Sequence, residues 1–388
     1  MPHPAIFNLG FRAFFSGAAV LAIVSIIIWV LYLNNIIGAE LLTINPLQWH
    51  AHEMLYGYAM AVIAGFLLTA VRNWTGKQTP QGYSLAALFC LWVTARLVFM
   101  AGDEFLYAAA VFDLSFNLAL LIAIAKPIIQ VKQWRQLAIL SKLVLLGAGN
   151  ALFYWGAIAG HEALLQLSTY GALYLIIGLI LTIGRRVIPF FIERGVDYPV
   201  ELWNSKPLDI SSMVVFLGLF ISELFLELPM LSVTLAGLMF CITTIRLTGW
   251  HTAGIWKTPL LWGLYLSLCL INIGFALLII QHWLSLSPYL ALHAFAIGGI
   301  GGMTLAMMAR VSIGHTGRSL KQTPLLLPAA LALCLGAALT RSVLPILAPE
   351  HYTLWLNISA GAWVLAFSLF FLAVIPYLAT PRPDGKPG

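Results

Sequence analysis

Residues 14–33 read FFSGAAVLAIVSIIIWVLYL, an apolar run without a charged side chain. An α-helix needs about 20 such residues to cross the hydrocarbon core of a bilayer. Similar runs follow along the chain, and they lack the strict alternation of a membrane β-strand. We therefore predict an all-α fold, a polytopic transmembrane helical bundle of about 12 spans. The predicted spans are 14–33, 49–71, 82–101, 104–125, 137–159, 164–184, 208–228, 230–249, 259–281, 288–309, 324–346 and 352–378.

The composition supports a membrane protein and excludes several other classes. Of the 388 residues, 61% are apolar and only 9% are charged, whereas about 25% are charged in soluble domains. This excludes a soluble enzyme, a disordered chain and a disulfide scaffold. The net charge of +6 does not indicate nucleic-acid binding, because the positive charges are sorted by loop. The lipid bilayer is the partner that the composition predicts.

The distribution of lysine and arginine predicts the orientation of the chain. Of the 20 basic residues, 17 lie in segments on the same side of the predicted membrane as the N-terminus, and the opposite loops hold none. The other three, Arg96, Lys142 and Arg341, fall within spans. Because basic residues accumulate in cytoplasmic loops, we expect both termini to be cytoplasmic.

The sequence predicts one integral membrane domain over residues 1–388. We expect two six-span halves, 1–184 and 208–388, joined by the cytoplasmic segment 185–207. That segment carries apolar and aromatic residues, so it is a candidate for the membrane interface. The tail 379–388 is polar and rich in proline and glycine, which predicts a loose terminus.

Two histidines begin the second predicted span, in the sequence WHAHEMLYGY over residues 49–58. Polar groups inside a bilayer are costly, so each one is a candidate functional residue. His50 and His52 are spaced i, i+2 and lie about 200° apart on an ideal helix. The pair favours a metal or haem site, and the alternative is interfacial histidines without a ligand role.

A third histidine, His293, begins a glycine-rich stretch in the tenth predicted span. Gly298, Gly299, Gly301 and Gly302 remove side chains over more than one helical turn. Such glycines permit close helix packing. They would equally leave room for a flat macrocycle beside the helix, so both interpretations stay open.

His315 follows His293 by 22 residues. On a continuous helix the two would be roughly 33 Å apart, so they cannot bind the same metal ion. A second metal site at His315, joined by His251, is one interpretation. A solvated loop histidine is the other.

Two arginines, Arg96 and Arg341, lie at the same predicted membrane depth as His50, His52 and His293. Arginine binds carboxylates through two parallel hydrogen bonds. The partners could be haem propionates. Alternatively, the arginines form intramembrane ion pairs, for which the candidate acids are Glu53, Asp113 and Glu223.

Four stretches of the chain resemble the NnrS family. They are FNLGFRAFF (7–15), WHAHEMLYGYAMAVIAGFLLTAVRNWTGK (49–77), GRRVIPFF (184–191) and HAFAIGGIGGMTLAMMARVSIGHTGR (293–318). The resemblance implies a multi-pass protein of the bacterial inner membrane with haem, expected to be b-type, and copper. It also implies a role in the nitric oxide response, with nitric oxide as the ligand that is bound, detoxified or limited in its damage.

The resemblance carries over candidate ligands but does not separate iron from copper ligands, and it identifies no electron donor. Whether nitric oxide is turned over also stays open. The candidate metal ligands are His50, His52, His293 and His315, and the candidate haem contacts are His50, His52, His293, Arg96 and Arg341.

Two further functions remain as alternatives. The architecture looks like the catalytic subunit of haem–copper oxidases and nitric oxide reductases, whose second and tenth helices carry the histidines of a haem. The sixth and seventh spans here hold no histidine for the copper site of those enzymes. One alternative is therefore a quinol-linked nitric oxide reductase-like oxidoreductase, and the other is a membrane transporter of a metal or metal-nitrosyl species.

Overall fold

A computed structural model of the chain describes residues 4–38, 44–226 and 228–385. These residues form helices and no strands. Eleven helical segments are long and apolar enough to cross a membrane, and the apolar helix Tyr83–Phe99 is shorter. These twelve segments coincide with the twelve predicted spans, so the prediction of a polytopic helical bundle is confirmed. The predicted orientation of the termini stays a prediction.

The helices of the described residues vary widely in length. The α-helices are α1 (Gly10–Leu33), α2 (Pro46–His52), α3 (Met60–Thr75), α4 (Tyr83–Phe99), α5 (Leu106–Gln130), α6 (Leu137–Ala159), α7 (Glu162–Gly195), α8 (Lys206–Ile221), α9 (Pro229–Trp250), α10 (Pro259–Leu284), α11 (Tyr289–His293), α12 (Met303–His315), α13 (Leu326–Ser342), α14 (Leu344–Leu347) and α15 (Tyr352–Ala379). Three π-helical turns are η3 (Glu53–Ala59), η6 (Ser222–Leu226) and η8 (Ala294–Gly302). Short 3-10 turns are η1 (Ala5–Phe7), η4 (Asp103–Phe105), η5 (Trp134–Gln136), η7 (Ala253–Lys257) and η9 (Pro349–His351).

Two connecting regions differ in extent from the sequence prediction. Helix α7 continues to Gly195, so the first part of segment 185–207 is helical and the rest is irregular up to α8. After α15 the chain has no helix over residues 380–385. The last part of the predicted loose tail, 386–388, lies outside the described residues.

The chain divides into two compact units that do not follow the sequence order of the predicted halves. Unit 1 comprises Met1–Leu175, Met308–Gln322 and Phe367–Gly388. Unit 2 comprises Ile176–Met307 and Thr323–Ala366. Each of the helices α7, α12 and α15 therefore contributes to both units.

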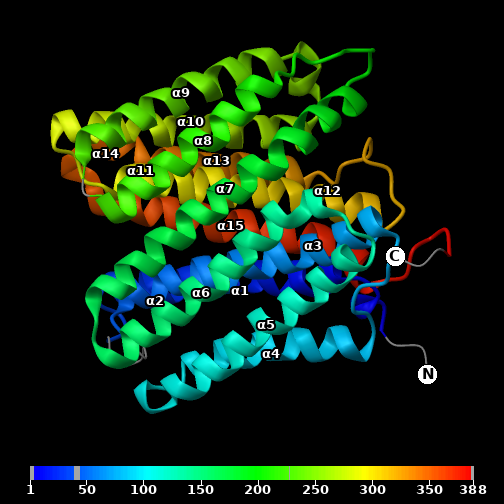
Figure 1. Ribbon diagram of the computed structural model, residues 1–388, viewed down its shortest axis with the longest axis horizontal. Helices are drawn as coiled ribbons and strands as arrows, with labels where there is room; N and C mark the ends of the chain where they lie inside the picture. The colour runs from blue at the N-terminus through cyan, green and yellow to red at the C-terminus, as the bar shows by residue number, and fades with distance from the viewer. Residues whose placement is uncertain (1–3, 39–43, 227, 386–388) are drawn as a thin grey trace. The chain divides into compact units, whose positions relative to one another are not determined.

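In unit 1, α1 packs along α3 and η3, and α5 packs against α4 and α6 (Figure 1). Phenylalanine rings and alanines of α1 are buried in this packing. Arg12, which the prediction placed just before the first span, lies inside α1 and is fully buried. Its Nη1 donates to the carbonyls of Tyr377, Leu378 and Thr380 at 3.1, 2.8 and 2.8 Å. The last backbone carbonyls of a helix have no hydrogen-bond donor within the helix. Arg12 supplies a donor to carbonyls at the C-terminus of α15.

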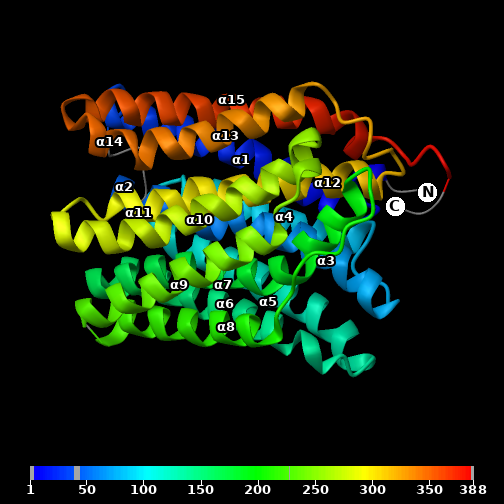
Figure 2. The same cartoon turned by 90° about the horizontal axis from the view of Figure 1, so that it is seen from above.

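In unit 2, α9 packs against α8 and α10, and α10 also packs against η8 and α13 (Figure 2). A polar contact joins the N-terminal part of α8 to two other helices of this unit. Asp209 accepts hydrogen bonds from Arg185 and Arg246, each at 3.0 Å. The remainder of the helix contacts in unit 2 are mainly apolar.

Candidate functional site

The second predicted span is interrupted directly after its two histidines. Helix α2 ends at His52, the π-helical turn η3 follows, and α3 continues the span. A π-helical turn changes the rotation of the side chains around the helix axis, and such turns occur frequently at functional sites. Here the turn carries two buried polar side chains, Glu53 and Tyr56, into the interior of unit 1.

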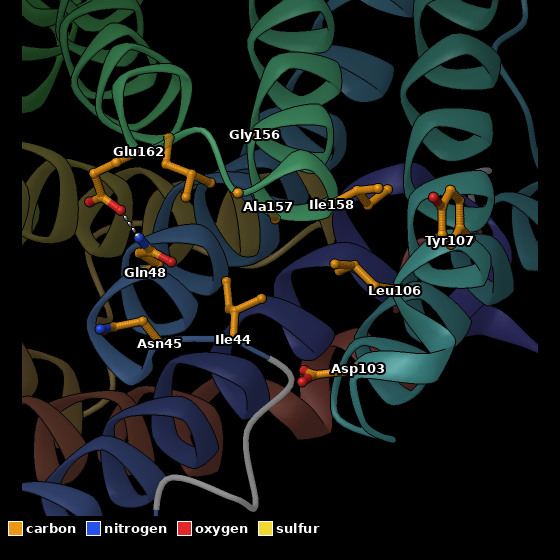
Figure 3. A pocket seen from close by; sticks show the side chains of 12 residues that line it. Ile44, Asn45, Gln48, Asp103, Leu106, Tyr107, Gly156, Ala157, Ile158 and Glu162 are labelled. Atoms are coloured by element: carbon orange, nitrogen blue, oxygen red, sulfur yellow. Dashed lines mark hydrogen bonds between the residues drawn. The ribbon is translucent and has the colours of Figure 1, made fainter.

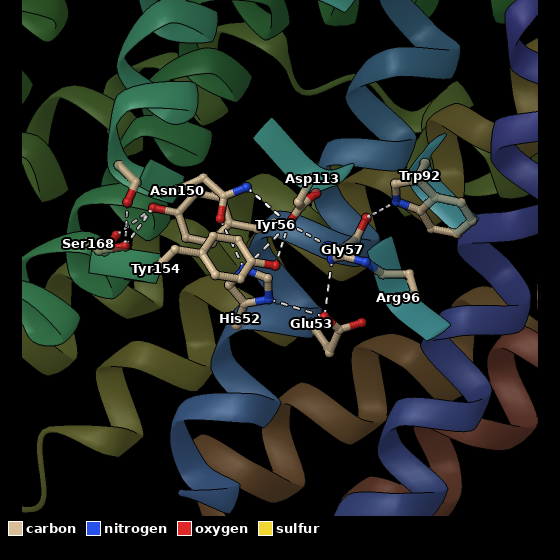
Figure 4. A network of polar contacts seen from close by, with 11 residues as sticks. His52, Glu53, Tyr56, Gly57, Trp92, Arg96, Asp113, Asn150, Tyr154 and Ser168 are labelled. Atoms are coloured by element: carbon tan, nitrogen blue, oxygen red, sulfur yellow. Dashed lines mark hydrogen bonds and ion pairs between the residues drawn. The ribbon is translucent and has the colours of Figure 1, made fainter. Parts of the chain in front are cut away.

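Both ring nitrogens of His52 contact oxygen atoms of neighbouring side chains (Figure 4). Nδ1 lies 3.1 Å from Oε1 of Glu53, and Nε2 lies 3.0 Å from Oδ1 of Asn150. Oδ2 of Asp113 lies 3.6 Å from the same Nε2. The histidine, both acids and the asparagine are all buried. The histidine is thus the centre of a polar network that joins α2 and η3 to α5 and α6.

Arg96 of α4 connects the two acids of this network. Its Nη1 lies 3.1 Å from Oε1 of Glu53, and its Nη2 lies 2.5 Å from Oδ2 of Asp113. Only 6% of the arginine side chain is exposed. Of the two interpretations for Arg96, the intramembrane ion pair is therefore the one that the structure contains.

The orientation of the Asn150 amide is fixed by Asp113. Nδ2 of Asn150 donates to Oδ2 of Asp113 at 3.1 Å, and the Tyr154 hydroxyl donates to the same oxygen at 3.2 Å. The amide oxygen of Asn150 therefore points at His52. Because an amide oxygen and an ionised carboxylate accept hydrogen bonds only, both ring nitrogens of His52 face acceptors.

The buried ionisable groups lie close together. Arg96 lies between the carboxylates of Glu53 and Asp113, and His52 contacts the same Glu53 oxygen as Arg96 does. A buried ion pair is tolerated only where opposite charges and hydrogen bonds compensate each group, and the requirement is stricter inside a bilayer. Here Oε2 of Glu53 and Oδ1 of Asp113 have no hydrogen bond among the described residues.

A glycine of the π-helical turn makes room for the arginine. A Cβ atom on Gly57 would lie 2.9 Å from Nη1 of Arg96 and 3.2 Å from Oε2 of Glu53. The Gly57 carbonyl accepts a hydrogen bond from Nε1 of Trp92 at 3.1 Å. Trp92 and Arg96 both belong to α4, so this helix contacts the turn at two points.

A second close approach fixes Tyr56 of the same turn. Its hydroxyl lies 2.9 Å from both the carbonyl and the Oγ of Ser168 on α7. A Cβ atom on Gly149 would lie 2.6 Å from this hydroxyl. The absence of a side chain at position 149 therefore lets the tyrosine reach across α6 to α7.

Aromatic rings surround the His52 imidazole. The ring centroids of Phe99 and Phe153 lie 4.6 and 4.4 Å from that of His52. Those of Tyr154 and Tyr56 lie 5.2 and 5.3 Å away. Aromatic faces attract a cation, so this shell is compatible with a positively charged imidazole.

A cavity of about 530 Å³ lies at one end of the same helices in unit 1 (Figure 3). Gln48 donates a hydrogen bond of 2.9 Å to Glu162 beside it. Gln48 precedes His52 by four residues, or about one turn of α2, and the lining residue Leu106 precedes Asp113 by about two turns of α5. The cavity therefore lies one to two helical turns from the polar network.

His50 has a different environment from His52. Its ring stacks on Trp29 of α1, with the centroids 4.7 Å apart and the planes 8° from parallel. The side chain is half-buried. The two histidines thus contact different neighbours, as their spacing on a helix predicts.

His293 is the last residue of α11 and directly precedes the π-helical turn η8 in unit 2. Its Nδ1 lies 2.6 Å from the carbonyl oxygen of Tyr289. Because a carbonyl only accepts, Nδ1 carries the hydrogen, and the neutral ring has its lone pair on Nε2. Metal-binding histidines commonly have one ring nitrogen fixed by a carbonyl in this way.

Neighbouring side chains pack closely against the glycines that follow His293. A Cβ atom on Gly298 would lie 2.5 Å from Cβ of Leu270, and one on Gly302 would lie 2.5 Å from Oγ of Ser267. A Cβ atom on Gly301 would overlap the ring of Trp363. Neighbouring side chains therefore fill the space beside these glycines, which supports the interpretation of close helix packing.

Arg341 is a buried cation in unit 2 with a neutral partner. Its Nη2 donates to the Tyr352 hydroxyl at 2.9 Å, and its guanidinium lies 5.1 Å from the centroid of that ring. Nη1 is buried without a hydrogen bond among the described residues. Among the residues that the structure describes, no carboxylate lies within ion-pair distance of Arg341. Among the described residues, the predicted ion pair is therefore present at Arg96 and not at Arg341.

The other two histidines of the sequence analysis have ordinary contacts. His315 ends α12 in unit 1, where its ring contacts Phe11 at a centroid distance of 5.9 Å and its carbonyl accepts from Arg382. His251 belongs to unit 2, and its Nε2 accepts from Nε1 of Trp256 at 3.1 Å. The two histidines belong to different units, and a shared metal site of His251 and His315 stays a prediction.

No group of three or more histidine, cysteine or acidic side chains is arranged to hold a metal ion within 4–38, 44–226 and 228–385. The nearest approach to such a group is the set of His52, Glu53 and Asp113. There the guanidinium of Arg96 lies between the carboxylates. This set does not fit a metal ion, because a cation is already present in it.

Some residues of the network have no clear signal in the sequence. Tyr154 lies four residues after Asn150, so the two share a helix face, but nothing in an apolar span indicates that the hydroxyl is used. Ser168 is equally inconspicuous. The π-helical turn itself leaves no sequence pattern that we could read.

The comparison with known proteins identifies the family. The NnrS protein family profile matches residues 5–382, which is nearly the whole chain. No curated protein matches the sequence. The chain belongs to the NnrS protein family and is a multi-pass membrane protein of the nitric oxide response.

Proposed function

We propose that this protein binds haem and copper in the bacterial inner membrane, and that it binds nitric oxide and limits its damage. The observation that supports the proposal best is the geometry of His293. The Tyr289 carbonyl orients its ring and assigns the hydrogen to Nδ1. The lone pair on Nε2 is the group that a metal ligand needs.

The candidate residues differ in how well they fit a haem. In unit 2, His293 fits the role of ligand. In unit 1, taken by itself, the half-buried His50 fits that role. Arg341 fits the role of a propionate partner, because it is a buried cation whose Nη1 has no hydrogen bond among the described residues. Arg96 does not fit that role, since two carboxylates already contact its guanidinium. When bound, the haem would supply an iron centre at which nitric oxide can bind.

The proposal of copper rests on family membership, and its candidate ligands are histidines. His50 and His315 remain the candidates, and an aromatic ring lies against the imidazole of each. The described residues supply no preformed group of three ligands. We therefore propose copper on the ground of family membership and treat its ligands as a prediction.

The test is a metal count and an absorption spectrum of the purified full-length protein. We expect stoichiometric haem whose oxidised or reduced spectrum changes with nitric oxide. Replacing His293 with alanine should remove most of the haem, and replacing His50 should lower it. Replacing the exposed His282 with alanine is the matched control. Full haem retention in both the His293 and the His50 variants would contradict the proposal.

The same preparation separates the alternatives. Consumption of nitric oxide with quinol as the electron source would indicate a reductase. Metal that exchanges readily, in protein without stoichiometric haem, would indicate a transporter. Binding of nitric oxide without turnover is the result that the proposal predicts.

A further inference from the structure

The two histidines of the second span have different roles in the structure of unit 1. We infer that His52 is a positioning residue at the centre of a buried polar clamp, and that His50 is the histidine of this span that serves as a ligand. The clamp consists of five buried side chains, namely His52, Glu53, Arg96, Asp113 and Asn150.

The first argument is the coordination of the ring nitrogens. Nδ1 of His52 contacts Glu53 at 3.1 Å, and Nε2 contacts Asn150 at 3.0 Å. A metal ligand needs a lone pair on one of these nitrogens. Ligation would therefore break one contact and leave a buried oxygen without its donor, which is costly.

The second argument is space. The His52 side chain has no exposed surface, and the rings of Phe99, Phe153, Tyr56 and Tyr154 lie around it. A flat macrocycle bound to Nε2 would have to displace Asn150 together with aromatic rings. The side chain of His50 is half-buried, whereas that of His52 is fully enclosed.

The third argument is the pairing of the acids. Arg96 lies between the carboxylates of Glu53 and Asp113, and His52 contacts the same Glu53 oxygen as Arg96 does. Losing one partner of a buried polar contact leaves the other partner without its hydrogen bond, which is costly. Removing His52 should therefore destabilise the fold even when no cofactor is bound.

The clamp holds the part of the chain that carries His50. His52 ends α2, and Glu53 begins the π-helical turn. Through Arg96, Asp113 and Asn150 these two residues are tied to α4, α5 and α6. Because His50 lies only two residues before His52 on α2, the clamp fixes the position from which His50 faces its ligand.

A double-variant experiment tests this role. The variants are His52→Gln, Glu53→Gln and the double variant, made in the full-length protein. Each single change removes one partner of the contact between His52 and Glu53 and leaves the other buried, whereas the double change removes both partners. We expect each single variant to lower the thermal unfolding midpoint by about 5 °C or more. We expect the double variant to recover at least half of the larger loss.

A metal ligand would behave differently. If His52 ligates, removing Glu53 as well cannot restore the lost bond. A double variant that is no more stable than His52→Gln would overturn the inference. The inference would also be overturned if the double variant recovers its stability but loses haem or copper tenfold or more per folded chain. His50→Gln is the matched control, and we expect it to lose cofactor while its midpoint, measured after metal removal, stays near that of the metal-free parent.

The design remains decisive if a single variant does not accumulate. Membrane accumulation then replaces the unfolding midpoint, and the double variant must exceed His52→Gln severalfold. If Glu53→Gln accumulates in the membrane and the double variant does not, the inference is overturned. The assignment of His50 as a ligand rests on the proposed function, but the comparison of stability between the single and double variants does not. Parent protein without haem or copper would refute the proposed function and leave the stability result to decide the role of His52.

Discussion

Two regions of this protein share a local distortion but differ in what surrounds it. In both η3 and η8 a π-helical turn begins directly after a histidine, His52 in unit 1 and His293 in unit 2. The first turn directs an acid and a tyrosine into a network of buried charges. The second contains four glycines that pack against apolar and small side chains.

This difference shows that the distortion does not itself determine the chemistry. In η3 the turn is held by charges, and its histidine is fully enclosed. In η8 the turn is held by close packing, and its histidine is oriented by one backbone carbonyl. The charged region should therefore be sensitive to the loss of a charge, and the glycine-rich region to the addition of volume.

The largest effect is expected for the loss of Arg96. Arg96→Met leaves Glu53 and Asp113 buried without their guanidinium, and breaking a buried pair in this way costs about 3–5 kcal/mol. We expect the variant to be nearly absent from the membrane. Size-exclusion chromatography of detergent extracts measures the amount of folded protein. Arg135→Gln, on an exposed arginine, is the control, and equal yields of the two variants would refute the role of the clamp.

A smaller effect is expected from added volume at η8. Gly301→Ala places a methyl group against the Trp363 ring, and overpacking of this kind costs about 1–3 kcal/mol. The matched control is Gly336→Ala in α13, where a Cβ atom meets nothing within 4 Å and alanine favours the helix. The thermal unfolding midpoint should fall for the first variant and stay level or rise for the second. Equal shifts would show that η8 is not tightly packed.

The smallest effect is expected from one hydroxyl at the edge of the clamp. Tyr154→Phe removes the hydrogen bond to Asp113 and leaves the ion pairs of Arg96 with both acids in place. Side-chain hydrogen bonds between membrane helices contribute about 0.6 kcal/mol on average. The variant should therefore fold with a slightly lowered midpoint. A loss as large as that of Arg96→Met would mean that the hydroxyl, and not charge balance, holds the network.

The sequence predicted the spans because the signal for a span is local. An apolar run of 20 residues indicates a helix whatever its neighbours are. The sequence also included Glu53 and Asp113 among the possible partners of Arg96, since buried charges must be compensated. Both contacts are present in the structure.

The remainder of the site depends on contacts between distant parts of the chain. Asn150 lies 98 residues from His52, and the sequence does not state which helices become neighbours. For the same reason, the sequence could not distinguish His50 from His52 as a ligand. Only the packing of α5 and α6 around His52 distinguishes the enclosed ring from the half-buried one.

The contact of Arg12 with the end of α15 has a consequence for biosynthesis. The guanidinium enters the membrane with the first helix, but the carbonyls that it binds belong to residues translated more than 360 positions later. For most of translation this cation lacks the partners that it has in the folded chain. The first helix can therefore make these contacts only after the end of α15 has been translated.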